Sequence, residues 1–353
     1  MLGMSKPIVQ APMAGVSTPS LAAQVSEAGG LGSLGIGAMK PEAAREAIRA
    51  TRALTGKAFN VNVFCHQPAV RDARVEDAWL RWLAPRFTDL GASVPDRLNE
   101  IYTSFVADPQ MLDVLLDEKP AVVSFHFGLP GRETIRRLKM AGIVLMASVT
   151  KLEEASMAAA SGIDVLVAQG IEAGGHRGVF DPEAVDEGLG ILPLTRMLVR
   201  SLDLPVIAAG GIMDGAAIAA VLMLGAEAAQ LGTAFVACPE SSIDRGYRSA
   251  LMNSSSVPTV LTRAISGRPA RSMANEFTAL GESPQAPATP DYPLAYDAGK
   301  ALHEAAKAHG KFGYGAQWAG QAARLARAMP AAELVRVLER ERVEAMQHTT
   351  LRA

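Results

Sequence analysis

Short runs of apolar residues alternate along this chain with longer segments in which alanine, leucine and charged residues recur at helical spacing. A strand followed by an amphipathic helix, many times over, is the pattern of a parallel sheet covered by helices. We count eight apolar runs of strand length: Pro7–Pro12, Leu31–Ile36, Phe59–Phe64, Ala121–Phe127, Ile143–Val149, Asp164–Gly170, Pro205–Gly211 and Ala226–Thr233. The pattern predicts an α/β protein whose eight strands form a (β/α)₈ or TIM barrel.

The segments between the apolar runs read as helices. Two clear examples are Thr18–Gly30 and Lys151–Gly162, in which apolar residues recur at helical spacing and a glycine closes the segment. Glycine is favoured just after the last turn of a helix because it adopts the left-handed conformation without strain. These segments are therefore expected to be helices that cover the barrel.

Two intervals are too long for a minimal βα unit, and both follow the carboxyl end of a predicted strand. In a barrel that end carries the active site, so the extra segments are expected to pack over it. We predict a ligand-binding barrel from residues 1–66 and 121–235. A lid or substrate region, with C-terminal helices packed on the barrel, is predicted from residues 67–120 and 236–353. The proline-rich segment Gly281–Pro293 is expected to be an extended connection.

Charge and composition narrow the class of protein. The chain has 34 Lys and Arg against 36 Asp and Glu, so no excess of positive charge is available for nucleic acid or anionic lipid. No apolar run reaches transmembrane length, and the first residues lack a signal-peptide core. Cys65 and Cys238 lie far apart and form no CxxC pair. We expect a cytoplasmic enzyme without a metal, a membrane contact or a nucleic-acid partner.

Glycines close the last two predicted strands. One strand ends in Gly210 and Gly211, and the other ends in Gln230, Leu231, Gly232 and Thr233. The loops after strands seven and eight form the common phosphate site of this fold, and glycine lets backbone N–H groups approach a phosphate closely. The alternative is that these glycines serve only tight turns. The pattern favours a phosphate without identifying the ligand that carries it.

The sixth predicted strand leads into the sequence AQGIEAGGHRG, residues 168–178. The amide of Gln169 offers a donor and an acceptor to the polar edge of a ring. Gly174 and Gly175 would let the loop pass close to a flat ligand or its phosphate. His176 in this loop is either catalytic or a residue that fixes the loop, and the sequence leaves both open.

Two further strand ends carry candidate ligand-binding residues: asparagines on the third strand, and a proline and a methionine at the end of the first. Asn60 and Asn62 lie on one face of the third strand, where burial is costly unless they are bonded. Asn62 is nearer the strand end and is the better candidate for a ring contact. Pro12 and Met13 at the first strand end could lie against a planar ring. Filling of the core accounts equally well for Met13.

His126 stands at the carboxyl end of the fourth predicted strand. A histidine has an ordinary pKa near 6.5 and can take or give a proton near neutrality. A purely structural role is the alternative, but catalytic residues of barrels come from strand ends of this kind. We therefore predict a role in proton transfer.

All five tyrosines fall in the predicted lid, and four of them are candidates for a pocket: Tyr102, Tyr247, Tyr292 and Tyr296. Tyr292, Tyr296 and Lys300 are spaced four residues apart, so in a helix they would share one face and line a pocket. Packing of an amphipathic helix on the barrel is the alternative. The chain has no GxSxG or P-loop motif and no GxGxxG after its first predicted strand, which argues against a hydrolase elbow and a Rossmann site.

Taken together, QAPMAG, FNVNVF, SFHFG, AQGIEAGGHRG, PVIAAGGI and QLGTAF resemble the nitronate monooxygenase family, formerly the 2-nitropropane dioxygenases. The SFHFG histidine, YDAGK and QWAGQ are similar to its class I branch. The resemblance implies an FMN enzyme, without a metal, that oxidises alkyl nitronates with O₂ to a carbonyl compound and nitrite. Propionate 3-nitronate is the implied substrate, and a monomer or homodimer is expected.

The resemblance also implies roles for particular residues. His126 matches the family's catalytic histidine. The positions that match its FMN site are Asn62, Gln169, Gly174, Gly211 and Gln230–Thr233, and those that match its substrate pocket are Tyr102, Tyr247, Tyr292, Tyr296 and Lys300. The family's second class carries its catalytic histidine in the GGH loop. SFHFG leads us to favour His126 and to place His176 in the substrate pocket.

Two rival functions remain open at this point. FMN-dependent quinone reductases and enoyl-ACP reductases share the barrel but take electrons from NADH or NADPH. A non-redox phosphate-binding barrel, such as an isomerase, a synthase or a barrel kept for binding, would have no flavin.

Overall fold

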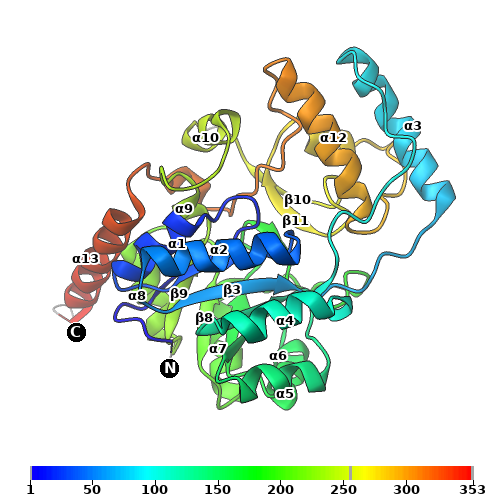
Figure 1. Cartoon of the computed structure of the whole chain (residues 1–353). Helices are drawn as coiled ribbons and strands as arrows, with labels where there is room; N and C mark the ends of the chain where they lie inside the picture. The colour runs from blue at the N-terminus through cyan, green and yellow to red at the C-terminus, as the bar shows by residue number, and fades with distance from the viewer. Residues whose placement is uncertain (1, 254–256, 351–353) are drawn as a thin grey trace.

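The computed structural model describes residues 2–253 and 257–350, and its centre is a closed barrel of eight parallel strands (Figure 1). The strands lie in the order β1-β9-β8-β6-β5-β4-β3-β2, and a parallel bridge between Val9 and Leu31 joins β1 to the start of β2. Their bounds are β1 Ile8–Gln10, β2 Gly32–Gly35, β3 Phe59–Phe64, β4 Val122–His126, β5 Val144–Val149, β6 Val165–Gln169, β8 Val206–Ala209 and β9 Ala228–Leu231. The predicted (β/α)₈ barrel is confirmed.

Helices surround the barrel: α1 Pro19–Glu27, α2 Pro41–Leu54, α4 Pro109–Glu118, α5 Arg132–Met140, α6 Leu152–Ser161, α7 Ile191–Ser201, α8 Gly215–Met223 and α13 Ala331–Thr350. The last of these comes from the end of the chain, yet it packs against α8 and α1 beside the first strands (Figure 1). Its buried side chains Leu334 and Leu338 share one apolar cluster with Ile218 of α8. The C-terminal helix thus completes the covering of the barrel.

The local sequence explains where α1 begins and where α6 ends; these are the helices predicted from Thr18–Gly30 and Lys151–Gly162. The Thr18 hydroxyl accepts the Leu21 N–H ahead of α1, and Pro19 occupies the first turn, where its missing N–H costs nothing. Helix α6 stops at Gly162, whose φ of 92° is the left-handed conformation that glycine adopts readily.

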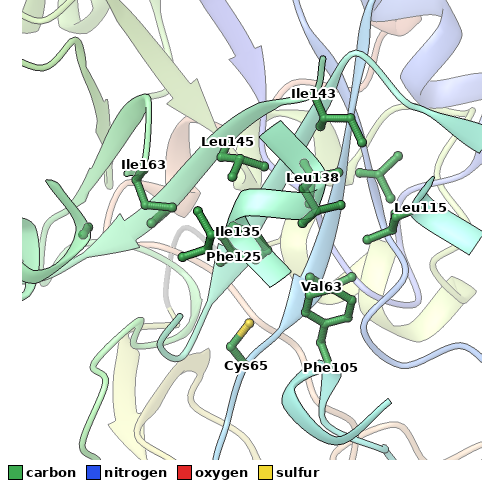
Figure 2. Close-up of a cluster of buried hydrophobic side chains, with 14 of the residues drawn as sticks. Val63, Cys65, Phe105, Leu115, Phe125, Ile135, Leu138, Ile143, Leu145 and Ile163 are labelled. Carbon is green, nitrogen blue, oxygen red and sulfur yellow. The ribbon is translucent and has the colours of Figure 1, made fainter. Parts of the chain in front are cut away.

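Side chains on the strands alternate between the surrounding helices and the inside of the barrel. Val63 and Phe125 point outward into an apolar cluster with Leu115 of α4 and Leu138 of α5 (Figure 2). The intervening residues of the same strands therefore face inward. Because side chains alternate in this way, those of Asn62 and His126 point toward the barrel interior.

The remaining elements form the lid above the carboxyl ends of the strands. They are α3 Ala73–Asp89, the 3₁₀ turn η1 Phe105–Ala107, α9 Thr233–Val236, α10 Arg245–Met252, α11 Glu276–Gly281, α12 Leu294–Ala308, η3 Ala323–Leu325, and a three-stranded sheet of β10 Thr259–Thr262, β11 Ala270–Met273 and β7 Gly175–His176. Helices α3 and α12 lie side by side (Figure 1) and share a core that includes Trp79, Leu83 and Leu302.

The structure differs from the sequence predictions for α4 and for Tyr292. Helix α4 lies in residues 67–120, yet it packs between α2 and α5, and its Leu112 and Leu115 belong to the barrel core. It is thus part of the barrel covering, because its apolar face matches the gap between those helices. Tyr292 precedes α12 rather than lying in it, so Tyr292, Tyr296 and Lys300 do not share one face of a helix. Of the predicted connection Gly281–Pro293, Gly281 is the last residue of α11, and the residues after it up to Pro293 lack helix and strand.

Candidate active site

A cavity of about 740 Å³ lies between the carboxyl ends of the barrel strands and the lid. Its walls bring together predicted residues from both parts of the chain: Pro12, Met13, Asn62, Tyr102, His126, Gln169, Gly174, Gly175, His176, Gly210, Gly211, Gln230, Gly232, Thr233, Tyr247, Tyr292, Tyr296 and Lys300. Leu231 is the exception. Its side chain packs with Ile8 and Leu334 in the cluster outside the barrel, because residues alternate along β9 and Gln230 takes the inward position.

One end of the cavity is lined by glycine. Gly210 and Gly211 have φ angles of 132° and 68°, which strain any residue with a side chain. Within the described chain, their backbone N–H groups donate to no protein acceptor. Gly232, at the end of the neighbouring strand β9, also lines the cavity, and an added β-carbon there would meet only Ala11 and Met13, at 3.5 and 3.8 Å. This end can hold an anionic group by its exposed N–H groups.

Asn62 is held by its neighbour on β4. Its Nδ2 donates to the backbone oxygen and the hydroxyl of Ser124 at 3.1 and 2.9 Å. Those bonds fix which side of the amide is the donor. The carbonyl oxygen Oδ1 therefore remains as the acceptor that this side chain offers to the cavity.

Gln169 is engaged with the loop that follows it. Its Nε2 donates to the His176 carbonyl at 2.9 Å, while its Oε1 accepts the Gly178 N–H at 2.7 Å. The buried Arg177 guanidinium also donates to the Gln169 backbone oxygen, at 3.0 Å, and is paired with Asp186 at 2.7 Å. These bonds tie the Gln169 amide to the loop and leave its second N–H for the predicted ring contact.

The imidazole of His126 enters the cavity beside the same loop. Burial lowers the pKa of His126 to about 4, and the contact of its Nε2 with the His176 carbonyl partly offsets that effect. The ring is neutral at physiological pH. It is in contact with the Phe127 ring, at 4.5 Å between centroids, which forms part of the same wall.

His176 is held by lid residues that are remote in sequence. It pairs with Ala270 of β11, and its Nε2 lies 2.9 Å from the Ser266 hydroxyl. The Trp318 ring packs on it at 5.0 Å between centroids. Burial lowers its pKa to about 3, so this ring is also neutral near pH 7.

Aromatic side chains close the other end of the cavity. The rings of Tyr102 and Tyr296 meet edge to face at 5.8 Å, and the Lys300 ammonium lies 5.2 Å from the Tyr102 ring centre. Such contacts are favourable between a cation and an aromatic face. The Tyr247 hydroxyl donates to the Trp318 carbonyl and holds that segment in place. The wall combines phenols with one ammonium.

Four residues of this end were not singled out from the sequence: Phe127, Ser266, Arg268 and Trp318. Phe127 and Trp318 line the cavity, and Ser266 and Arg268 support it from behind. The segment SGRPAR, residues 266–271, offered a signal, since it carries two arginines among residues too small and apolar for a solvated surface. QWAGQ contributed to the family resemblance but pointed to no individual residue.

No three His, Cys, Asp or Glu side chains gather as metal ligands in the part of the chain that the structure describes. None of its described helices is long and apolar enough to cross a membrane.

Comparison with known proteins shows the family. The family model for nitronate monooxygenase matches residues 1–341. A nitronate monooxygenase of Paraburkholderia phytofirmans is 67% identical, over 97% of this chain and 93% of that protein. The nitroalkane oxidase structure of Streptomyces ansochromogenes is similar with 42% identity, a TM-score of 0.90 and 98% coverage of each chain. The structure of FabK from Thermotoga maritima follows with 31% identity and a TM-score of 0.75, over 100% of this chain and 97% of that one. The chain is therefore an enzyme that belongs to the nitronate monooxygenase family.

Proposed function

We propose that this enzyme binds FMN and oxidises alkyl nitronates with O₂ to a carbonyl compound and nitrite, with propionate 3-nitronate as its substrate. The proposal rests on one observation: a single cavity has two ends that differ in chemistry. A glycine-lined end suits a phosphate, and an end lined by histidine, tyrosine and lysine suits a small anion.

The glycine-lined end fits the phosphate of FMN. Gly210 and Gly211 present free N–H groups, and Gly232 leaves room where a side chain would project beside Ala11 and Met13. Thr233 holds the lid segment above, since its hydroxyl accepts the Gly320 N–H at 3.0 Å. A dianionic group is stabilised by converging N–H donors of this kind.

The strand ends fit a flat polar ring. Asn62 offers Oδ1 to a ring N–H, while Pro12 and Met13 provide an apolar surface beside it. Bound FMN would supply the redox chemistry, by accepting electrons from the nitronate. The protein itself has to position the two molecules and to control protons.

Proton control falls to His126. The ring is neutral, and Nδ1 is free of protein partners in the described chain, so it can accept a proton from a nitroalkane or a hydrogen bond from a bound group. Tyr102, Tyr292 and Tyr296 keep bulk water away from this end because their rings are buried in the lid. A water-poor pocket strengthens every polar contact made to the substrate.

We also propose a cytoplasmic enzyme, as a monomer or a homodimer. Cys65 and Cys238 are both free thiols and both buried, which suits a reducing compartment. Gel filtration of the purified protein against size standards tests the oligomeric state.

The decisive experiment is a visible spectrum of the purified protein, followed by oxygen uptake and nitrite release with propionate 3-nitronate. Flavin absorbance and stoichiometric nitrite are expected. A protein that stays colourless after FMN is added would instead point to a non-redox phosphate-binding barrel.

The second candidate is an FMN-dependent reductase, because the FabK structure shares this architecture over the whole chain. Anaerobic mixing separates the two. If NADH or NADPH bleached the flavin rapidly and a nitronate did not, the reductase function would replace our proposal.

A further inference from the structure

Arg268 is a buried positive charge that forms no ion pair with any carboxylate in the described residues. The side chain is 4% exposed, and its guanidinium donates to the Val179 carbonyl at 2.5 Å. Its Nε has no partner, and no ion pair with it occurs in the described part of the chain. Burying a charge costs free energy unless the charge is paired. A function would explain why this chain keeps an unpaired guanidinium in its interior.

The guanidinium lies directly behind the cavity wall. Its central carbon stands 4.4 Å from the centre of the Phe127 ring, and that ring lines the cavity. Phe127 in turn contacts the rings of His126 and His176, at 4.5 and 5.5 Å between centroids. One aromatic ring therefore separates this charge from the histidine-lined end.

The negative charges of the cavity lie elsewhere. Of its lining residues, Asp244 and Glu304 are acidic, and they pair with His303 and Lys307 in the C-terminal half of α12. The His303 ring contacts Asp244, and Lys307 is paired with Glu304. No carboxylate offsets Arg268 from within the cavity.

Other titratable groups face this end from every element packed around it. They are His66 after β3, His126 on β4, His176 and Arg177 at β7, Tyr102 in the lid, and Tyr292, Tyr296 and Lys300 at α12. Asp181, Glu154 and Arg263 also act electrostatically on Arg268, but none of the three lines the cavity. The histidines are neutral near pH 7, the tyrosines are neutral phenols, and Arg177 is paired with Asp186. Arg268 and the exposed Lys300 are then the fixed positive charges.

We propose that Arg268 is a positioning residue: its guanidinium raises the electrostatic potential at the histidine-lined end and so favours an anionic ligand there without touching it. A charge acts strongly through a low-dielectric interior, and salt screens it little when it is buried. The inference deepens the proposed function, on which it rests, by naming the group that selects a nitronate anion over a neutral molecule.

Nitrate, a small planar anion, is the probe. Isothermal titration calorimetry at constant ionic strength would measure its affinity for the purified wild-type protein and for Arg268→Met and Arg268→Lys. We expect about tenfold or greater weakening for Arg268→Met and a change within about threefold for Arg268→Lys, which keeps the charge. Equal weakening in both variants would overturn the proposal, because it would assign Arg268 a role through shape alone. Since no turnover is involved, failure of nitronate oxidation would leave this result intact.

The wild-type protein gives a second test that does not depend on how the variants fold. Burial lowers the pKa of Arg268 to about 10, so its charge persists through pH 8.5. Nitrate affinity should stay flat between about pH 6 and 8.5. A tenfold loss per pH unit over that range would assign the charge to a titrating histidine and refute the proposal.

Lys300→Met serves as the matched control, since Lys300 is the other fixed cation. We expect Arg268→Met to weaken nitrate binding at least as much as Lys300→Met does. If Lys300→Met abolished nitrate binding while Arg268→Met left it unchanged, the source of attraction would be the lid lysine and the proposal would fail.

Discussion

The Nε2 atom of His126 lies 3.3 Å from the carbonyl oxygen of His176, a carbonyl that also accepts the Gln169 amide at 2.9 Å. A carbonyl can only accept, so His126 must carry its proton on Nε2 and leave Nδ1 as the basic nitrogen. The two histidines thus have different parts in the site. His176 contributes a backbone oxygen that orients the ring of His126.

Replacing the His126 ring is expected to remove the base. We predict that His126→Asn lowers kcat/KM for propionate 3-nitronate by about 10²-fold or more, within the range typical of general acid–base catalysis. Oxygen uptake at several substrate concentrations measures it. The matched change His176→Asn keeps the backbone carbonyl and should cost less than about tenfold. Wild-type turnover in His126→Asn together with loss in His176→Asn would reverse the assignment.

The buried histidines should make the fold sensitive to acid. Burial lowers the pKa of His66 and His126 to about 4 and that of His176 to about 3, against about 6.5 in the unfolded chain. The unfolded state binds more protons, so stability is full above pH 6.5 and is lost as pH falls toward 4. Each group contributes about 1.4 kcal/mol per pH unit to that slope.

Urea unfolding at intervals between pH 7 and 4.5 tests this slope. His126→Asn removes one of the three groups, so its free energy of unfolding should fall less steeply than that of the wild type, by about 1.4 kcal/mol per pH unit. Parallel curves for the two proteins would contradict the prediction, since acidic residues affect both equally.

The glycine-lined end should be sensitive to added volume. Gly232 has φ −102°, which suits other residues, and its added β-carbon would clash with nothing. Gly232→Val is therefore expected to fold normally and to bind FMN at least about tenfold more weakly, because its methyl groups occupy the proposed phosphate site. Fluorescence quenching of FMN measures the affinity. Gly56→Val, at a surface position with open space around it, should keep wild-type affinity. Unchanged binding in Gly232→Val would place the phosphate elsewhere.

The buried Arg177 should be essential to the loop after β6. It is fully buried, pairs with Asp186 at 2.7 Å and donates to the Gln169 and Gly170 carbonyls. We predict that Arg177→Met lowers the free energy of unfolding by about 3–5 kcal/mol, as breaking a buried ion pair does. Denaturant unfolding at pH 7 measures it. Arg136→Met, which breaks an exposed pair with Glu133, should change stability by less than about 1 kcal/mol. A small effect at both positions would show that Arg177 is dispensable.

Much of the barrel could be predicted because its signals are local. Apolar runs of strand length, the Thr18 cap and the Gly162 stop lie within a few residues of what they determine. The fold rule that ligands bind at strand carboxyl ends then placed Asn62 and His126 on the cavity. The same period of two would have excluded Leu231, had it been applied to β9.

The lid was less predictable, because its contacts join distant segments. Helix α4 and Tyr292 were misplaced since the sequence does not show which neighbour an apolar face will meet. The pairing of His176 with Ala270 of β11 connects residues nearly 100 positions apart, and no local sequence pattern predicts it.

The sequence by itself determined the barrel, the glycine-lined strand ends and the inward position of His126, since each follows from short-range periodicity and backbone conformation. Tertiary structure alone decided that the His176 carbonyl orients His126 and that Arg268 stands behind Phe127. Both depend on β11 and its preceding loop folding back over the sixth strand's loop. Such long-range packing depends on many weak contacts between distant segments, so no local sequence pattern predicts it.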